Sequence, residues 1–412
     1  MTGWRNIPFH AARLLLLLLP VALLFGARAP IDIVASSIAG LLVIHLVIHR
    51  AWAMLRQRWI YFGLAWWGWQ MLSALWAYDA RDALIAGLIW GRFLFFGIAV
   101  AYWLLADEAY EKRLLSVIAA VLAFLCVDTL YQYYIGTDLF GRAKVGERLT
   151  GPFQGQPIVG SAILHLFLPL LALAMAAAYR RARDYALALL MVGCMVVIII
   201  SGERAAAILM GLGIALLILL MRGMRSRSCA AVLLAAAALV LALQLGPLAE
   251  FSSARSTYVA ERHTRETWDV VSRFSESIYG LLWQDAWLMI TEHPLLGVGE
   301  RNIRVYWCEM QMQRLFPEGC AVHPHNVYLE IWASTGIIGL ALYLGMVASL
   351  LAIYARSYAS WRSDALMVGL VVAVLVRLWP LMFVTSHTRA ISAVLFWLVA
   401  GWAISRIQRL QK

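Results

Sequence analysis

The sequence predicts an all-α polytopic membrane protein. Of its 412 residues, 63% are hydrophobic and 14% are charged, whereas about a quarter of the residues in a soluble protein are charged. Apolar runs of about 20 residues, the length that a helix needs to cross a bilayer, recur along the whole chain. The net charge of +11 falls mostly in short connections between these runs. We therefore interpret it as a topology signal and expect no nucleic-acid partner.

The apolar runs predict about twelve membrane-spanning helices, because lipid cannot satisfy an open backbone. A basic segment, Met1–Arg13, precedes the first run and could be taken for a secretory signal. Ile33–Ile48 is apolar again, so we expect the first span to be retained. The expected spans lie at about 11–27, 33–48, 59–77, 83–105, 114–135, 157–179, 184–200, 204–221, 228–245, 327–354, 365–384 and 390–406.

The charges of the connections predict the orientation. If the N-terminus is cytoplasmic, each even-numbered connection holds two or three basic residues, whereas among the short odd-numbered connections the first holds only Arg28 and the third only Arg81. By the positive-inside rule both termini are then cytoplasmic. Residues 1–245 would form spans one to nine, with a periplasmic loop at about 136–156. Residues 246–325 would form a large, partly helical periplasmic loop, and residues 326–412 spans ten to twelve.

Two cysteines of the large loop, Cys308 and Cys320, lie twelve positions apart. In an oxidising periplasm they are candidates for a disulfide, with two free thiols as the alternative. The cysteines show no metal-ligand spacing, and the sequence carries no nucleotide-binding loop. We expect neither a metal nor a cofactor.

The junction between the large loop and the next apolar run holds the strongest candidate for catalysis. Pro324 ends any preceding helix, and His325 and Asn326 are placed to cap the next one. An imidazole with an ordinary pKa of about 6.5 can accept a proton from a sugar hydroxyl at neutral pH. His323 competes for this role, and the alternative for either histidine is a helix cap or a surface position.

Two outward-facing turns carry further candidates. Ser201–Arg204 is a tight connection that puts Arg204 in the first turn of a span, where a guanidinium group can hold a phosphate. The alternative is an ion pair with Glu203. Arg148 opens a Gly/Pro-rich loop, Arg148–Pro157, that is suited to lining a site but is also typical of a plain turn.

Arg92 and Arg377 lie within predicted spans, where a charge is costly and therefore suggests a function. Each could contact an anionic lipid headgroup. The alternative for both is structural, the neutralisation of Asp128 elsewhere in the bundle.

Together these motifs resemble those of the O-antigen ligase and polymerase group of bacterial envelope enzymes. In that group a His-Asn pair is followed, after nine residues, by Gly, two residues and a small residue. Here His325-Asn326 is followed by Gly336 and Gly339. Three further segments resemble other motifs of the group: His293–Gly299, Ser201–Arg204 and Arg148–Gly151.

The resemblance implies an O-antigen ligase with a fold similar to C-type glycosyltransferases. Such an enzyme moves O-antigen polysaccharide from undecaprenyl pyrophosphate to lipid A-core at the periplasmic face of the bacterial inner membrane, without metal or nucleotide, and with inversion if the acceptor attacks directly. Arg204 and an arginine of the large loop would hold the pyrophosphate; we favour Arg273, then Arg265, because they precede Tyr279. His325 would act as base or orient the acceptor.

Several alternatives share these residues. An O-antigen polymerase or a protein O-oligosaccharide ligase would use the same donor with another acceptor. Covalent catalysis would need a carboxylate, for which Glu203, Glu292 and Glu330 are available. A transporter could use the buried charges as a solute pathway, although no repeat of the kind common in transporters is visible.

Overall fold

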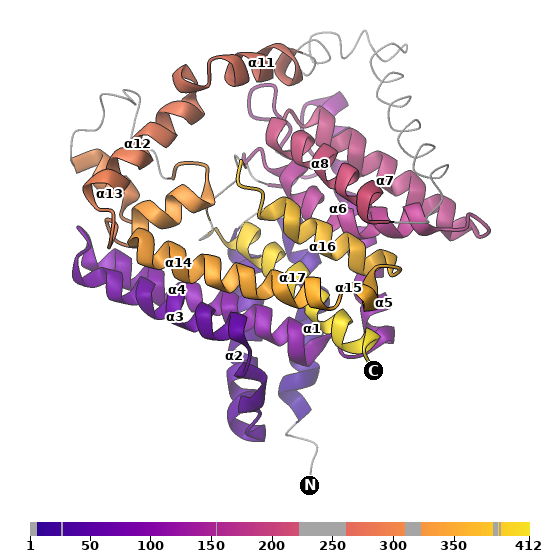
Figure 1. Cartoon of the computed structure of the whole chain (residues 1–412). Helices are drawn as coiled ribbons and strands as arrows, with labels where there is room; N and C mark the ends of the chain where they lie inside the picture. Colours follow the sequence, from indigo (N-terminus) through magenta and orange to yellow (C-terminus); the bar gives the residue numbers. More distant parts are fainter. Residues whose placement is uncertain are drawn as a thin grey trace.

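The computed structural model describes residues 6–25, 28–153, 155–221, 261–309, 323–381, 386 and 389–412. Every named element within these ranges is a helix (Figure 1). The α-helices are α1 (Ile7–Ala22), α2 (Arg28–His49), α3 (Arg58–Leu72), α4 (Ala80–Ala99), α5 (Glu108–Ile135), α6 (Val159–Ala176), α7 (Ala182–Ile200), α8 (Arg204–Leu220), α11 (Arg265–Ser272), α12 (Ile278–Glu292), α13 (Ile303–Glu309), α14 (Val327–Arg356), α15 (Tyr358–Trp361), α16 (Ala365–Arg377) and α17 (Ala390–Leu410). Short helical turns are η2 (Leu23–Phe25), η3 (Trp52–Leu55), η4 (Ser73–Leu75), η5 (Val100–Leu104) and η6 (Phe274–Glu276).

The chain is an integral membrane protein. In its described part, 8 helices are long and apolar enough to cross a membrane, and α8 and α16 are shorter apolar helices. Each expected span except the ninth coincides with a helix of the structure. The ninth, at about 228–245, lies outside the described residues. The all-helical class is thus confirmed, whereas the number of spans and the likeness to C-type glycosyltransferases remain predictions.

The helices form two groups around α17. The first consists of α2, α3, α4 and α14, and the second of α5, α6, α7, α8 and α16 (Figure 1). Helix α17 packs against members of both groups, and 89% of its most apolar window is buried. A helix that is apolar on all sides belongs in such a central position. The start of α1 and the end of α17 lie on the side of the bundle away from α11 and α12 (Figure 1).

The end of α17 is fixed by a cluster of paired charges. The carboxylate of Glu111, on α5, is 1% exposed and accepts hydrogen bonds from Trp402 Nε1 and from the guanidinium groups of Arg406 and Arg409. Arg406 also contacts Asp364 at 2.7 and 2.8 Å. Buried charges are tolerated where they are paired and hydrogen-bonded in this way. The cluster ties α5, α16 and α17 together.

Helix α14 is broken at Gly336, which adopts φ 68° and ψ −176°. This conformation is essentially restricted to glycine, and a Cβ there would overlap the Leu295 carbonyl oxygen. The loop 293–299 fits into the break: Val298 and Gly299 donate to the carbonyls of Ala333 and Ser334 at 2.9 and 2.8 Å, and Ile337 donates to Pro294 O at 2.9 Å. The loop therefore supplies the backbone partners that the broken helix lacks.

The same loop is also attached to the connection between α3 and α4. Glu300 N donates to Ser73 Oγ at 3.0 Å, and Asp79 N donates to Asn302 Oδ1 at 2.6 Å. Residues 293–302 thus join the connection between α3 and α4 to the broken helix α14. From there α13 follows, while α12 and α11 extend across the top of the molecule until α11 lies above α8 (Figure 1).

Candidate active site

His325 and His323 lie together immediately before α14. Asn326 caps this helix: its Oδ1 accepts from Tyr328 N and Leu329 N at 3.0 and 3.2 Å, and its Nδ2 donates to Pro380 O at 2.9 Å. His325 adopts a left-handed backbone conformation with φ 53°. Its N–H donates to Nδ1 of His323 at 3.1 Å, and the two rings are 4.2 Å apart. Asn326 therefore makes the helix cap that was predicted for this junction. Neither histidine side chain caps α14.

The surroundings of His325 change its acid–base behaviour. Burial, followed by the positive fields of His323 and Arg389, lowers the pKa of His325 from 6.5 to about 3. The ordinary pKa expected from the sequence is therefore wrong. At neutral pH the imidazole carries no charge, so it can accept a hydrogen bond from a hydroxyl group, but it is a weak base.

A polar cavity of about 680 Å³ opens next to the histidines, a size typical of ligand sites. Its wall comes from α2, α4, α13, the start of α14 and the residues before α17. The lining residues that carry charge or hydrogen-bonding groups are Asp32, Asp82, Arg92, Arg301, Arg304, His323, Glu330, Ser334, Ser386 and Arg389. Two predicted site residues, Arg92 and His323, are among them.

Several charges of this wall are paired across elements. Arg92, on α4, holds Asp32, on α2, through two contacts of 2.6 and 3.1 Å. The expectation that Arg92 neutralises Asp128 is therefore wrong; Asp128 accepts from Leu139 N instead, at 2.9 Å. Arg301 lies 3.5 Å from Asp82, and its side chain is 53% exposed. The cavity thus presents guanidinium and carboxylate groups side by side.

The turn Ser201–Arg204 forms a second cluster of arginines. Glu203 does not pair with Arg204: its carboxylate accepts from Gly160 N, Ser161 N and Ser161 Oγ at the start of α6. Arg204 lies 3.3 Å from Glu266 at the start of α11. Arg262 contacts the same carboxylate at 3.0 Å and donates to Gly202 O at 2.7 Å. Glu266 therefore holds two guanidinium groups together at this turn.

The two loop arginines favoured from the sequence do not contact the Arg204 turn in the described structure, whereas a third does. Arg273 is 65% exposed and pairs with Asp269 on its own helix, 3.4 Å away. Arg265 is also exposed. Arg262, which lies further from Tyr279 than both, is the loop arginine that contacts the Arg204 turn. Of the three arginines, Arg262 precedes α11, Arg265 begins it and Arg273 follows it, and only Arg262 is hydrogen-bonded to the Arg204 turn.

Arg148 lies beside this turn, as the order of the motifs suggests. Leu149 N donates to Ser201 O at 3.3 Å, and Arg148 donates to Pro157 O at 3.1 Å. The loop itself is fixed from α5, where Gln132 Oε1 accepts from Thr150 N and Gly151 N at 2.8 and 2.9 Å. The Gly/Pro-rich segment is therefore an ordered support for the turn.

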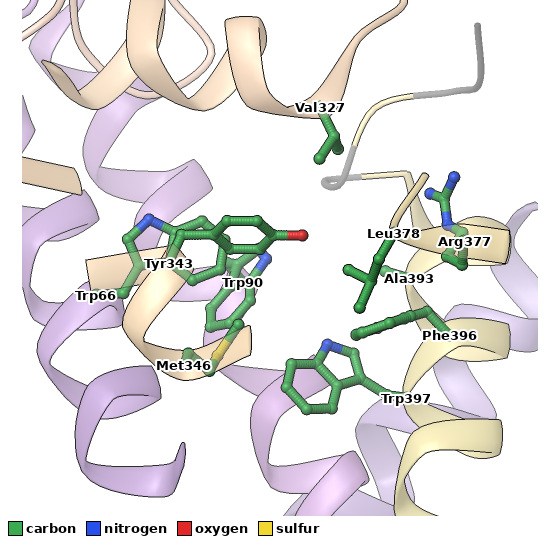
Figure 2. Close-up of a pocket in the computed structure, with 10 residues that line it drawn as sticks. All are labelled: Trp66, Trp90, Val327, Tyr343, Met346, Arg377, Leu378, Ala393, Phe396 and Trp397. Carbon is green, nitrogen blue, oxygen red and sulfur yellow. The ribbon is translucent and has the colours of Figure 1, made fainter. Parts of the chain in front are cut away.

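Arg377 is not among the residues that line the polar cavity. It lines a small pocket of about 30 Å³ with Trp66, Trp90, Tyr343 and Trp397. Figure 2 shows its guanidinium group at the edge of the pocket, turned away from the indole rings. Trp90 lines both this pocket and the polar cavity, so it forms part of the wall between them. A pocket this small and aromatic is packing space and not a ligand site.

Residues 186–344 match the family model described as O-antigen ligase. This segment of the chain therefore carries the O-antigen ligase domain of that family. The matched segment contains the Arg204 turn, Arg262 and the histidine junction. Members of this family are glycosyltransferase-like ligases and polymerases, with polysaccharide and lipid-linked substrates. No curated protein matches the chain.

Most of the polar residues that line the cavity were not predicted from the sequence. Arg301, Arg304 and Arg389 had no motif to single them out, although Arg301 lies two residues after the His293–Gly299 segment. The structure records Cys308, a further lining residue, as disulfide-bonded. Cys320 lies outside the described residues, so the pairing of the two remains a prediction. In the part of the chain that the structure describes, no group of three or more His, Cys, Asp or Glu residues could hold a metal ion.

Proposed function

We propose that this member of the O-antigen ligase family transfers O-antigen polysaccharide from undecaprenyl pyrophosphate to lipid A-core. The reaction would take place at the periplasmic face of the bacterial inner membrane, with both termini in the cytoplasm. One observation carries the proposal: the matched segment holds both an arginine pair suited to a pyrophosphate and a neutral histidine beside a polar cavity. Glycosyl transfer needs a group that stabilises the leaving pyrophosphate and a group that positions the acceptor hydroxyl.

The donor is assigned to the Arg204 turn. Breaking the bond between the anomeric carbon and the pyrophosphate oxygen leaves negative charge on the pyrophosphate. Fixed guanidinium groups lower the free energy of that charge in the transition state. Arg204 and Arg262 are held 3.3 and 3.0 Å from the carboxylate of Glu266. A pyrophosphate, which carries more negative charge than one carboxylate, would displace Glu266 and take both arginines.

The acceptor is assigned to His325. The neutral imidazole accepts a hydrogen bond from the acceptor hydroxyl and directs its oxygen at the anomeric carbon. The new carbon–oxygen bond forms as the bond to pyrophosphate breaks, which inverts the anomeric centre, and the hydroxyl proton passes to the imidazole. Because the pKa of His325 is about 3, we assign most of the rate acceleration to the arginines and an orienting role to the histidine.

Transfer by the purified full-length protein tests this proposal. The donor is a glycan linked to undecaprenyl pyrophosphate, and three acceptors are offered separately: rough lipopolysaccharide, free repeat units and pilin. We expect product on rough lipopolysaccharide. Product on repeat units would indicate a polymerase, and product on pilin a protein-directed ligase.

Variants of the two loop arginines sharpen the assignment of the donor site. Arg204→Ala and Arg262→Ala should each lower the transfer rate by about 100-fold or more, since each removes charge from the leaving group. Arg273→Ala is the matched control and should stay within about twofold, because a side chain paired on the surface contributes little. A folded Arg204→Ala protein with full activity would contradict the proposal.

A further inference from the structure

Arg301 occupies a backbone conformation that is unfavourable for its residue type. Its φ of 59° is left-handed, a region in which a Cβ crowds the backbone. The contacts of its neighbours impose it: Gly299 N is bound to Ser334 O, and Asn302 is bound to Asp79. Strain of this kind is concentrated at functional sites. Glycine would be the residue of lowest strain here, so the arginine side chain itself needs an explanation.

The cavity that Arg301 lines has the chemistry of a sugar site. A hydroxyl group both donates and accepts hydrogen bonds, so a hydroxyl-rich ligand needs acceptors as well as donors in the wall. The lining offers four arginines as donors and three carboxylates as acceptors. Trp90 and Phe93 add aromatic faces, on which the apolar face of a sugar ring can pack.

The position of the cavity assigns it to the acceptor. His323 lines it and accepts the backbone hydrogen bond of His325. Arg389 lines both this cavity and a narrow pocket beside Ser161 at the start of α6. That helix start is bound by Glu203, the residue before Arg204. The cavity therefore reaches the histidine junction and, through Arg389, the neighbourhood of the arginine turn assigned to the donor.

We propose that the cavity between α2, α4, α13 and the start of α14 binds the sugar that receives the glycan, and that Arg301 and Asp82 hydrogen-bond its hydroxyl groups. The inference rests on the proposed function, and it adds a location and two specificity-determining residues. Arg301, at 53% exposure, and Asp82, at 34%, stand at the accessible side of the wall, where an acceptor can reach them.

Replacing Arg301 by glycine distinguishes a role of its side chain in acceptor binding from a role in the stability of the fold. Arg301→Gly removes the side chain and relieves the backbone, so the melting temperature should not fall. The KM for rough lipopolysaccharide should rise by about tenfold or more, as expected for losing a charged hydrogen bond to the ligand. The KM for the lipid-linked donor should stay within about twofold.

Arg50→Gly is the matched control. Arg50 is also an arginine with left-handed backbone, φ 52°, but it lies between α2 and α3, away from the residues that line the cavity. It should leave both KM values unchanged. If Arg301→Gly leaves the acceptor KM unchanged, or raises the donor KM instead, the cavity is not the acceptor site.

Two further measurements keep this inference independent of the transfer assay. Rough lipopolysaccharide should bind the full-length protein without donor, and Arg301→Gly should weaken that binding. This measurement reports on the cavity even if the protein transfers nothing, in which case only the proposed function fails. A double variant that exchanges the charges, Asp82→Arg with Arg301→Asp, should not restore acceptor binding. Full restoration would mean that the pair is only a structural tie, and would overturn the inference.

Discussion

Two clusters of arginine and carboxylate lie at opposite ends of α17. Arg389 directly precedes the helix and lines the polar cavity, whereas Arg406 and Arg409, near its end, bind Glu111. With 21 residues between Ala390 and Leu410, the two clusters are about 30 Å apart. They use the same types of side chain.

The clusters differ in how their charges are enclosed. At the far end Glu111 is 1% exposed, and the arginine side chains that hold it are 17% and 19% exposed. At the cavity Arg301 is 53% exposed and faces about 680 Å³ of open space. A closed cluster can only hold helices together, while an open one can exchange its partners for a ligand. Burial, more than residue type, therefore distinguishes the structural cluster from the functional one.

The largest expected effect comes from breaking the closed cluster. Glu111→Gln leaves two arginines without their carboxylate and should lower the free energy of unfolding by about 3–5 kcal/mol. Chemical denaturation in mixed micelles measures this. Lys112→Gln, which removes an ion pair with both side chains at least 70% exposed, should change it by less than about 0.5 kcal/mol. Equal effects of the two variants on the free energy of unfolding would mean that burial does not make the Glu111 cluster more important for stability than an exposed ion pair.

A substitution at the break in α14 tests the backbone contacts that hold the loop carrying Arg301 in place. Gly336→Ala places a Cβ against the Leu295 carbonyl in a conformation reserved for glycine. It should destabilise the protein by about 3 kcal/mol and displace the loop that carries Arg301. Gly40→Ala, on α2 with nothing within 4 Å of the new Cβ, should be neutral or slightly stabilising. A Gly336→Ala protein of unchanged stability would show that the loop does not depend on the break.

Low pH should destabilise the folded protein through His325. Its pKa falls from 6.5 in the unfolded chain to about 3 in the fold, so between these values the unfolded state binds the extra proton and stability decreases as the pH falls. At pH 5 the loss is about 2 kcal/mol relative to pH 7.5. His325→Asn tolerates the left-handed backbone and should lack this loss. Thermal unfolding of both proteins from pH 7.5 to 5 provides the comparison; parallel curves would mean that another group is responsible.

The smallest effect is expected at the cap of α14. Asn326→Ala removes the acceptor for Tyr328 N and Leu329 N and should cost about 1 kcal/mol. Asn326→Asp keeps this acceptor and loses only the bond to Pro380 O. If the aspartate variant is destabilised as much as the alanine variant, the bond to Pro380, and not the cap, is the important contact.

Much of the fold could be predicted because lipid imposes simple rules. Apolar length located the helices, and Pro324 with Asn326 located the start of α14. The sequence motif includes Gly336, but it did not predict that α14 breaks there. The break depends on hydrogen bonds with the loop 293–299, which lies about 40 residues earlier in the chain. A one-dimensional pattern does not report which distant carbonyls a loop will bind.

The site was predicted less completely, for a related reason. His325, Asn326 and Arg204 stand in compact local patterns, and the structure brings them to helix ends as expected. Arg262 and Arg301 gain their roles from contacts with Gly202 and Asp82, which lie far away in sequence. The pKa of His325 likewise depends on burial and on Arg389. Local spacing identifies a candidate residue, but its neighbours in space determine its charge and partners.

The attachment of residues 293–302 also implies an order of assembly. The groups that receive this segment first, Ser73 and Asp79, belong to the part of the chain that a ribosome makes early. The carbonyls of Ala333 and Ser334 emerge only afterwards. The segment can therefore dock on the α3–α4 connection before α14 exists, and then serve as the template on which the broken helix closes. On this view the wall of the cavity is completed only after α14 and Arg389 have been made, so a chain that ends before Arg389 lacks part of it.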